Sequence, residues 1–214
     1  VCGRCEECRD CGRRATRYFQ YSRSAVRYDG MMKELLARYK YRGDERLSTL
    51  FVHMLDRAYT LLAERRRLED GAIEPNRGGS LFGRIRPALP DFDCLSYIPL
   101  SEIRLEERGF NQAERMAAGI GARHRMPVIP LLTRVRHTEK QSQKAWAGRM
   151  TDMSGAFGVD ERGGEQLTKL ERRRERPRIV LVDDVYTTGS TLNEASRMLT
   201  ERFDAEVYGL TWAR

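Results

Sequence analysis

Short apolar segments alternate with segments of helical periodicity along most of the 214-residue chain. Aromatic and β-branched residues over positions 18–28 predict a strand, which closes at the turn signal Asp29-Gly30. Apolar side chains then recur every three or four positions, which predicts one helix from Met31 to Gly43 and another from about position 47 to position 70. Glycine and proline over 71–90 predict a loop.

The second half of the chain repeats this alternation. Strands are predicted over 93–100, 179–185 and 205–214, with a further extended segment over 126–135. A loop leading into a helix is predicted over 108–125, and another helix begins near Leu192. Residues 136–156 lack strong periodicity and predict a mobile loop. The pattern as a whole favours an α/β fold with an open parallel sheet flanked by helices.

Composition narrows the class of protein. Hydrophobic residues make up 40% of the chain, which permits a core, and Cys94 is expected there as a small buried residue. No stretch approaches the roughly 18 apolar residues of a membrane span, so we expect none. The chain opens at Val1 without a basic-then-apolar leader, which favours a cytoplasmic location and leaves open whether residues precede it.

The charge balance permits a phosphate or nucleic-acid partner. The formal net charge is +8, and arginine supplies all but five of the 39 lysine and arginine residues. Arginine makes bidentate contacts with phosphate, but a generally arginine-rich composition explains the excess equally well. The arginine-rich run over 171–178 is interpreted as a solvated loop, with a phosphate-backbone contact beside the ligand cleft as the alternative.

The segment 179–191, IVLVDDVYTTGST, carries the most specific chemistry. An apolar strand ends in the carboxylates Asp183 and Asp184, and small hydroxyl-bearing residues then lead into a helix. Backbone N–H groups at a helix N-terminus suit a phosphate, and carboxylates can accept hydrogen bonds from sugar hydroxyls. The generic pattern also occurs in α/β proteins that bind no ligand. The loop residues are Thr187, Thr188, Gly189, Ser190 and Thr191.

The full string resembles the phosphoribosyl-diphosphate (PRPP) signature of type I phosphoribosyltransferases. That resemblance implies a phosphoribosyltransferase-like sheet over 18–214. It also implies that the catalytic carboxylates Asp183 and Asp184 contact the ribose, that 187–191 hold the 5′-phosphate, and that Mg²⁺ accompanies the diphosphate.

Two further segments resemble the ComF family, phosphoribosyltransferase-like proteins linked to DNA uptake in competent bacteria. One is RGFNQ over 108–112, where Glu106 replaces the first arginine of the pattern and Arg104 can substitute for it. Arg104, Arg108 and Asn111 are therefore candidate phosphate-binding residues. The alternative is a helix-capping loop with solvated arginines. Other matching positions are Lys40, Gly43, Asp44, Arg136, Thr138, Gln141, Arg149, Gly155, Ala156 and Phe157.

Four cysteines crowd into the first residues of the chain as Cys2, Cys5, Cys8 and Cys11. Paired C-x2-C turns suit a structural zinc ion, and the ComF resemblance implies such a zinc element over 1–17. The two cysteine pairs of a zinc site are usually further apart in the sequence, so two alternatives stay open. One is an iron–sulfur cluster. The other is a site without metal, in which one cysteine pair lacks a partner pair upstream.

Two functions follow from the resemblance. The first is a PRPP-binding protein that handles incoming single-stranded DNA during transformation, with a competence helicase or other DNA-processing proteins as partners. The second is an active phosphoribosyltransferase that transfers ribose 5-phosphate to an unidentified base. Trp212 is the candidate for stacking on such a base, although a place in the core is the favoured interpretation.

Overall fold

A four-stranded sheet of parallel strands forms the centre of the computed structural model, which describes residues 16–41, 46–71, 90–135, 155–170 and 174–214. The strands lie in the order β1 (Phe19–Val26), β6 (Glu206–Ala213), β5 (Arg178–Val185) and β2 (Cys94–Tyr97). Each neighbouring pair is parallel, and Leu95 also forms a parallel bridge to Val128. The predicted open parallel sheet is confirmed.

Strand β5 lies inside the sheet, and this position explains its unbroken apolar run. Successive side chains of a strand point to opposite faces. Val180 and Val182 pack in one hydrophobic cluster, whereas Ile179 and Leu181 pack in the other. All four side chains are fully buried, as expected for a strand covered on both faces.

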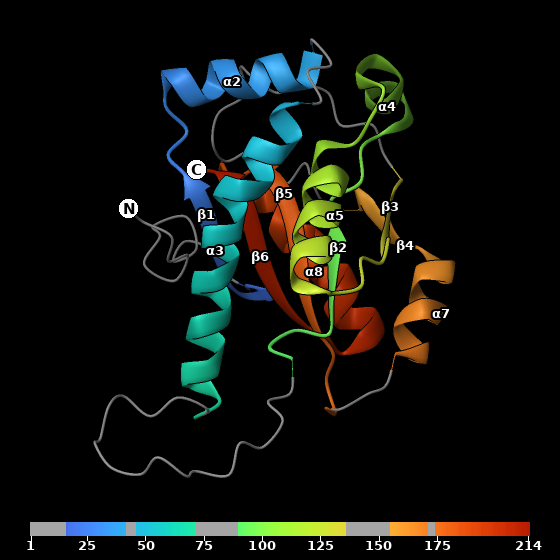
Figure 1. Ribbon diagram of the computed structural model, residues 1–214. Coiled ribbons are helices and arrows are strands. Elements are labelled where there is room, and N and C mark those ends of the chain that lie inside the picture. The colour runs from blue at the N-terminus through green and yellow to red at the C-terminus, as the bar shows by residue number, and fades with distance from the viewer. Residues whose placement is uncertain (1–15, 42–45, 72–89, 136–154, 171–173) are drawn as a thin grey trace, which may run out of the picture.

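Helices cover the two faces of the sheet, as Figure 1 shows. The first cluster joins one face to α2 (Gly30–Tyr41), α3 (Leu47–Glu69) and α5 (Gln112–His124). The second joins the opposite face to α8 (Ser190–Phe203) and α7 (Glu161–Lys169). Helix α2 lies across the end of the molecule at which the parallel strands end (Figure 1).

Four aromatic rings anchor α2 and α3 to the sheet. Tyr39 stacks on Phe51 with ring centroids 4.6 Å apart, and Phe51 lies 4.3 Å from Trp212. Phe110, just before α5, packs edge-on against Tyr39 with ring centroids 5.1 Å apart. Trp212 is fully buried, so it belongs to the core and not to a base-stacking surface. Cys94 is also buried as predicted, and burial raises the pKa of its thiol.

The structure adds elements that the sequence pattern did not predict. Residues Glu102–Arg108 form helix α4, where the sequence pattern predicted no helix. The extended segment over 126–135 contains β3 (Leu132–Arg134), which pairs with β4 (Phe157–Val159) in a separate antiparallel ribbon. Both differences involve elements of three to seven residues, which are too short to establish a hydrophobic period.

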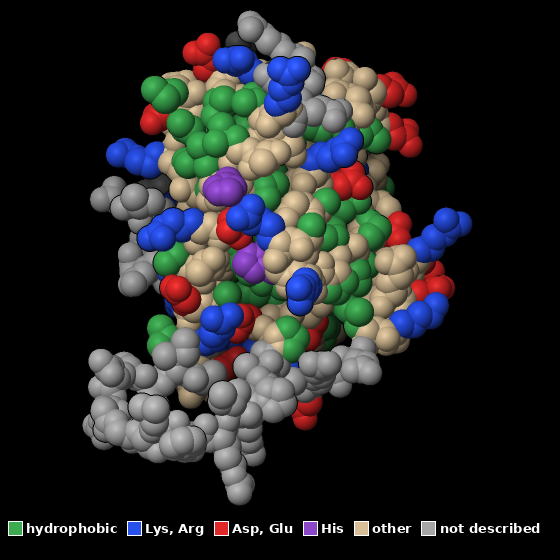
Figure 2. Space-filling view, in the orientation of Figure 1, with side chains coloured by type: hydrophobic (Ala, Val, Ile, Leu, Met, Phe, Trp, Pro, Cys, Tyr) green, Lys and Arg blue, Asp and Glu red, His purple; other side chains and the backbone are tan. Residues whose placement is uncertain are grey.

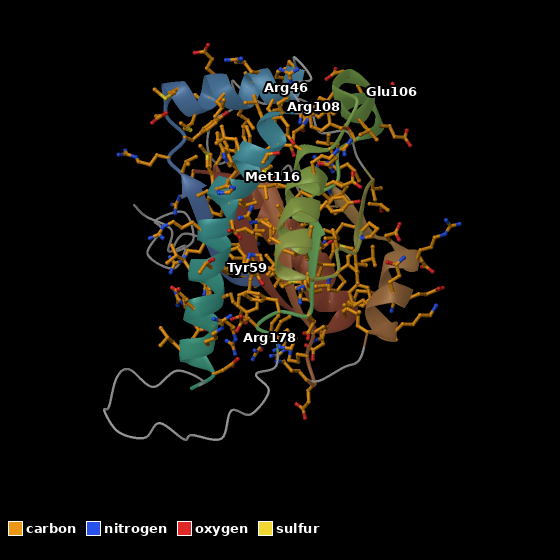
Figure 3. The ribbon with its side chains drawn as sticks, viewed as in Figure 1. Arg46, Tyr59, Glu106, Arg108, Met116 and Arg178 are labelled. Atoms are coloured by element: carbon orange, nitrogen blue, oxygen red, sulfur yellow. The ribbon has the colours of Figure 1, made fainter. Side chains whose placement is uncertain are left out.

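The end of the arginine-rich run lies in an ion-pair network and not beside the acidic pair. Arg178 is buried at the start of β5, where its guanidinium contacts Asp70 at 2.6 Å and Glu206 at 3.2 Å. Arg174 pairs with Asp93 at 3.2 Å. The solvated-loop interpretation holds for the exposed residues Glu175 and Arg176 but not for the buried Arg178, and positions 171–173 lie outside the described residues. Asp183 and Asp184 lie at the other end of the strand that Arg178 begins, so Arg178 is not beside the acidic pair. Figure 3 shows Arg178 and Arg108 at opposite ends of the molecule.

Several predicted features lie outside the described residues. These are the cysteines of 1–11, the positions Gly43 and Asp44, and most of the loop predicted over 136–156, with Arg136, Thr138, Gln141 and Arg149.

Candidate functional site

Asp183 and Asp184, the two carboxylates that are predicted to contact a sugar, lie near the end of strand β5, at the carboxyl edge of the sheet. Asp183 lies opposite Thr211 of β6 in the register, and one oxygen of its carboxylate accepts a hydrogen bond of 2.8 Å from the backbone N–H of Asp184. Ligands of open parallel sheets bind beyond this edge. Because neighbouring residues of a strand point to opposite faces, the two carboxylates have different surroundings.

Asp184 is held from helix α2. Its Oδ2 forms an ion pair with Nζ of Lys40, and the two side chains are 19% and 15% exposed. Such limited exposure reduces screening by water, so this pair is stronger than a fully exposed one. Lys40 matched the ComF pattern in the sequence, but its contact with the acidic pair could not be foreseen, since the two residues are far apart in the chain.

Asp183 titrates in an unusual range. Burial, together with the negative charge of Asp184, raises the pKa of its carboxyl from 3.8 to about 7. The backbone hydrogen bond from Asp184, the ammonium of Lys40 and the guanidinium of Arg134 act in the opposite direction. A carboxyl with such a pKa changes charge near neutral pH, which is a frequent property of functional sites.

Arg134 acts on Asp183 from another element, and Arg104 in turn acts on Arg134. Arg134 ends strand β3, and its guanidinium lies over the Phe157 ring, 4.7 Å from the centroid. Burial and the positive charge of Arg104 lower the pKa of Arg134, whereas Asp183 raises it. Arg104 lies in α4 and acts on Arg134, so phosphate binding by Arg104 stays a prediction. The sequence analysis did not identify Arg134 as a candidate site residue. The only indication in the sequence was that an arginine follows an apolar extended segment.

The loop after β5 has the form expected of a phosphate cradle. Gly189 has φ 75° and precedes α8, which begins at Ser190. The side-chain oxygens of Thr188 and Ser190 are 2.9 Å apart in a hydrogen bond, and the Ser190 N–H lies 3.4 Å from Thr188 Oγ1. Thr187 is exposed and Thr191 is half-buried, whereas Thr188 and Ser190 are buried. Phosphate binding by this loop stays a prediction.

The segment 108–112 connects α4 to α5, and its polar residues have clear structural contacts. The Asn111 side chain caps α5 by accepting hydrogen bonds from the N–H groups of Ala113 and Glu114, and its amide donates to the Ile98 carbonyl at 3.0 Å. Arg108 donates to Gln112 Oε1 at 2.8 Å. The helix-capping interpretation therefore holds for Asn111, while phosphate binding by Asn111 and Arg108 stays a prediction.

The described residues bear on the two expected metals in different ways. Among them, no group of three or more histidine, cysteine, aspartate or glutamate side chains is arranged to hold a metal ion. The four cysteines expected to bind zinc lie outside the described part of the chain.

The predicted DNA contact has no obvious patch on the face formed by α3 and α5. Figure 2 shows basic side chains there interspersed with acidic and hydrophobic ones. Asp56, for example, contacts both Arg123 and His124. No helix of the described residues has the length and apolar character of a membrane span.

Comparison of the sequence with those of known proteins identifies the family of this chain. The chain matches no family model. It is 31% identical over 211 residues to competence protein ComFC of Bacillus subtilis, a match that covers 94% of this chain and 71% of that protein. Competence protein F of Haemophilus influenzae is 33% identical over 54% of this chain and 48% of its own length.

A third relative, competence protein ComFC of Streptococcus pneumoniae, is 26% identical over 84% of this chain. The chain covers 61% of that protein, so two of the three relatives extend well beyond the matched region. The Bacillus subtilis match covers most of both proteins at 31% identity, and the chain therefore belongs to the ComF family.

Proposed function

We propose that this chain binds PRPP at the carboxyl edge of its parallel sheet and acts in DNA uptake during natural transformation, where it handles incoming single-stranded DNA in the cytoplasm. The observation that carries the proposal is the joint placement of the acidic pair, the hydroxyl-rich loop before α8, and the basic residues Lys40, Arg104 and Arg134 at one edge of the sheet.

The charges at this edge suit the parts of PRPP. The 5′-phosphate would lie against the backbone N–H groups and hydroxyls of 187–191, where the positive end of α8 favours a dianion. The ribose hydroxyls would donate hydrogen bonds to Asp183 and Asp184. The diphosphate would then extend towards Arg104 and Arg134, whose guanidinium groups can each contact two phosphate oxygens.

When bound, Mg²⁺ would neutralise part of the diphosphate charge. The residues of this chain that would hold the complex are the arginines, which bind the diphosphate oxygens, and the acidic pair, which orients the ribose. Because the substrate phosphates supply several of the oxygen ligands of Mg²⁺, the protein need not supply a complete metal cage.

The role in DNA uptake is supported by the relatives, all three of which are named competence proteins. A net charge of +8 is compatible with a nucleic-acid partner.

We propose that the cysteine element over 1–17 binds one structural zinc ion. Release of metal by a thiol-blocking reagent should then give about one zinc per chain in a dye assay. A folded, metal-free protein would contradict that role.

The alternative function, an active phosphoribosyltransferase, uses the same phosphosugar site. A base nitrogen would displace diphosphate from the anomeric carbon of the ribose, and the carboxylates would stabilise the positive charge that develops there. Trp212 cannot stack on that base, because its ring is fully buried against Phe51.

Labelled single-stranded DNA distinguishes the two functions. Its affinity should fall steeply as salt is added, and it should change when PRPP and Mg²⁺ are present, because linked sites alter each other's affinity. DNA affinity that is insensitive to salt and to PRPP, together with diphosphate release in the presence of a base, would favour the enzyme instead.

A further inference from the structure

The ion pair between Lys40 and Asp184 gives one residue outside the predicted loop a defined place in the phosphosugar site. We propose that Lys40 is a positioning residue, which holds Asp184 from the α2 side so that both carboxylates are presented to the ribose hydroxyls. This inference rests on the proposed function.

The geometry of β5 requires support from two directions. Asp183 and Asp184 are neighbours in one strand, so their side chains leave it in different directions and meet different basic residues. Arg134 of β3 acts on Asp183, whereas Lys40 of α2 contacts Asp184. Each carboxylate therefore has a cation from a different element.

Lys40 is held in place by its neighbours in α2. The adjacent residue Tyr39 is fully buried between Phe51 and Phe110, and Leu36, one turn earlier, is 1% exposed. Because α2 is anchored in this way, the Lys40 ammonium group is already held near Asp184 before a ligand binds. Ligand binding therefore costs little further conformational entropy at this side chain. Phe110 belongs to the 108–112 segment, so α2 also connects the acidic pair to that part of the candidate site.

The electrostatics extend the role of Lys40 to Asp183. The charged groups that act on Asp183 are Asp184 from the same strand, Lys40 from α2 and Arg134 from β3, and Arg104 of α4 acts on Arg134 in turn. Lys40 lowers the pKa of Asp183, so its removal should raise that pKa above its value of about 7. More Asp183 would then be protonated at neutral pH and unavailable as a full hydrogen-bond acceptor.

The test is calorimetric titration of PRPP with Mg²⁺ into wild-type protein, Lys40→Met, Lys40→Arg and Lys33→Met. At pH 7, Lys40→Met should bind about tenfold more weakly, the usual scale of coupling between close charged groups. At pH 9 the loss should shrink, because Asp183 is then ionised in both proteins. Lys40→Arg should restore most of the affinity. Lys33→Met is the matched control, since Lys33 is an exposed residue of the same helix.

The outcomes separate this inference from the proposed function. Wild-type protein that binds no PRPP would overturn both. Wild-type binding with unchanged affinity in Lys40→Met would overturn only the role of Lys40, as would a Lys40→Arg variant that binds as weakly as Lys40→Met. If Lys40→Met does not fold by circular dichroism, Lys40→Gln, which keeps a polar side chain without the charge, gives the same comparison.

Discussion

Gly189 lies directly against the ring of Tyr186 at the turn between β5 and α8. A Cβ atom at position 189 would come within 2.3 Å of the Tyr186 hydroxyl oxygen, and the backbone there has φ 75°. Tyr186 is itself fixed, because its side chain is 3% exposed and its backbone N–H donates to Ala213 at 2.9 Å. Both the conformation and the space at this turn therefore require glycine.

Gly189→Ala should consequently disrupt the loop. We expect about 2 kcal/mol or more of lost stability from the clash and the strained backbone, and loss of PRPP binding. Gly155→Ala is the control, because Gly155 has φ 69° but no atom within 4 Å of an added Cβ. Comparison of their unfolding free energies isolates the clash. Equal effects of the two substitutions would show that Tyr186 does not restrict this turn.

The raised pKa of Asp183 predicts that the site lowers stability at high pH. The carboxyl is protonated in both folded and unfolded chains below about pH 4, and stability is lost as the pH rises through its folded pKa of about 7. Asp183→Asn should therefore be more stable than wild type at pH 8, by about 2 kcal/mol, and equal to it near pH 4.

Thermal unfolding at several pH values measures this difference. Glu165→Gln is a suitable control, since Glu165 is an exposed carboxylate of α7 that is 3.9 Å from Lys169. A stability difference between Asp183→Asn and wild type that does not vary with pH would show that burial of Asp183 does not shift its titration.

Arg178 supports the opposite end of the sheet. Its Nη1 and Nη2 bind both oxygens of Asp70, at 2.6 and 2.9 Å, and hydrogen bonding to Arg178 is the main reason that the pKa of Asp70 is lowered. Arg178→Met leaves Asp70 and Glu206 without this partner and should cost about 3 kcal/mol at pH 7. The deficit should shrink as the pH falls and Asp70 becomes protonated in the wild type.

Arg176→Met is the matched control for Arg178→Met. Arg176 pairs with Asp204 at 2.8 Å, but the two side chains are 43% and 76% exposed. An exposed pair of this kind contributes less than about 1 kcal/mol. Similar losses in the two variants, measured by denaturant unfolding at pH 7, would contradict the special role of the Arg178 network.

Asn111 tests whether a polar residue of the 108–112 segment serves the fold or the ligand. Asn111→Ala removes the cap of α5 and the hydrogen bond to Ile98, so we expect a loss of about 2 kcal/mol. Asn111→Ser keeps a capping oxygen and should lose less. Normal unfolding of Asn111→Ala together with weaker PRPP binding would instead assign this side chain to the ligand.

The sequence predicted the parts of the molecule that follow from local pattern. The apolar run of Ile179–Val182 correctly indicated a strand buried on both faces, and Trp212 was correctly expected in the core. Helix α4 was missed because Glu102–Arg108 buries no residue and so leaves no hydrophobic period.

The site was predicted only where its residues are neighbours in the chain. Asp183, Asp184 and the loop over 187–191 form one continuous motif. Lys40 and Arg134 reach the acidic pair only because α2 crosses the edge of the sheet and β3 ends beside Asp183. Such contacts depend on tertiary packing, which a single sequence does not contain.

The central claim is that PRPP binds at the acidic pair. Calorimetric titration of PRPP with Mg²⁺ into wild-type protein and into the double variant Asp183→Asn/Asp184→Asn tests it most directly. We predict saturable binding to the wild type at about one PRPP per chain, and no detectable binding to a double variant that remains folded by circular dichroism. Equal affinity in the two proteins would contradict the assignment of these carboxylates to the ribose.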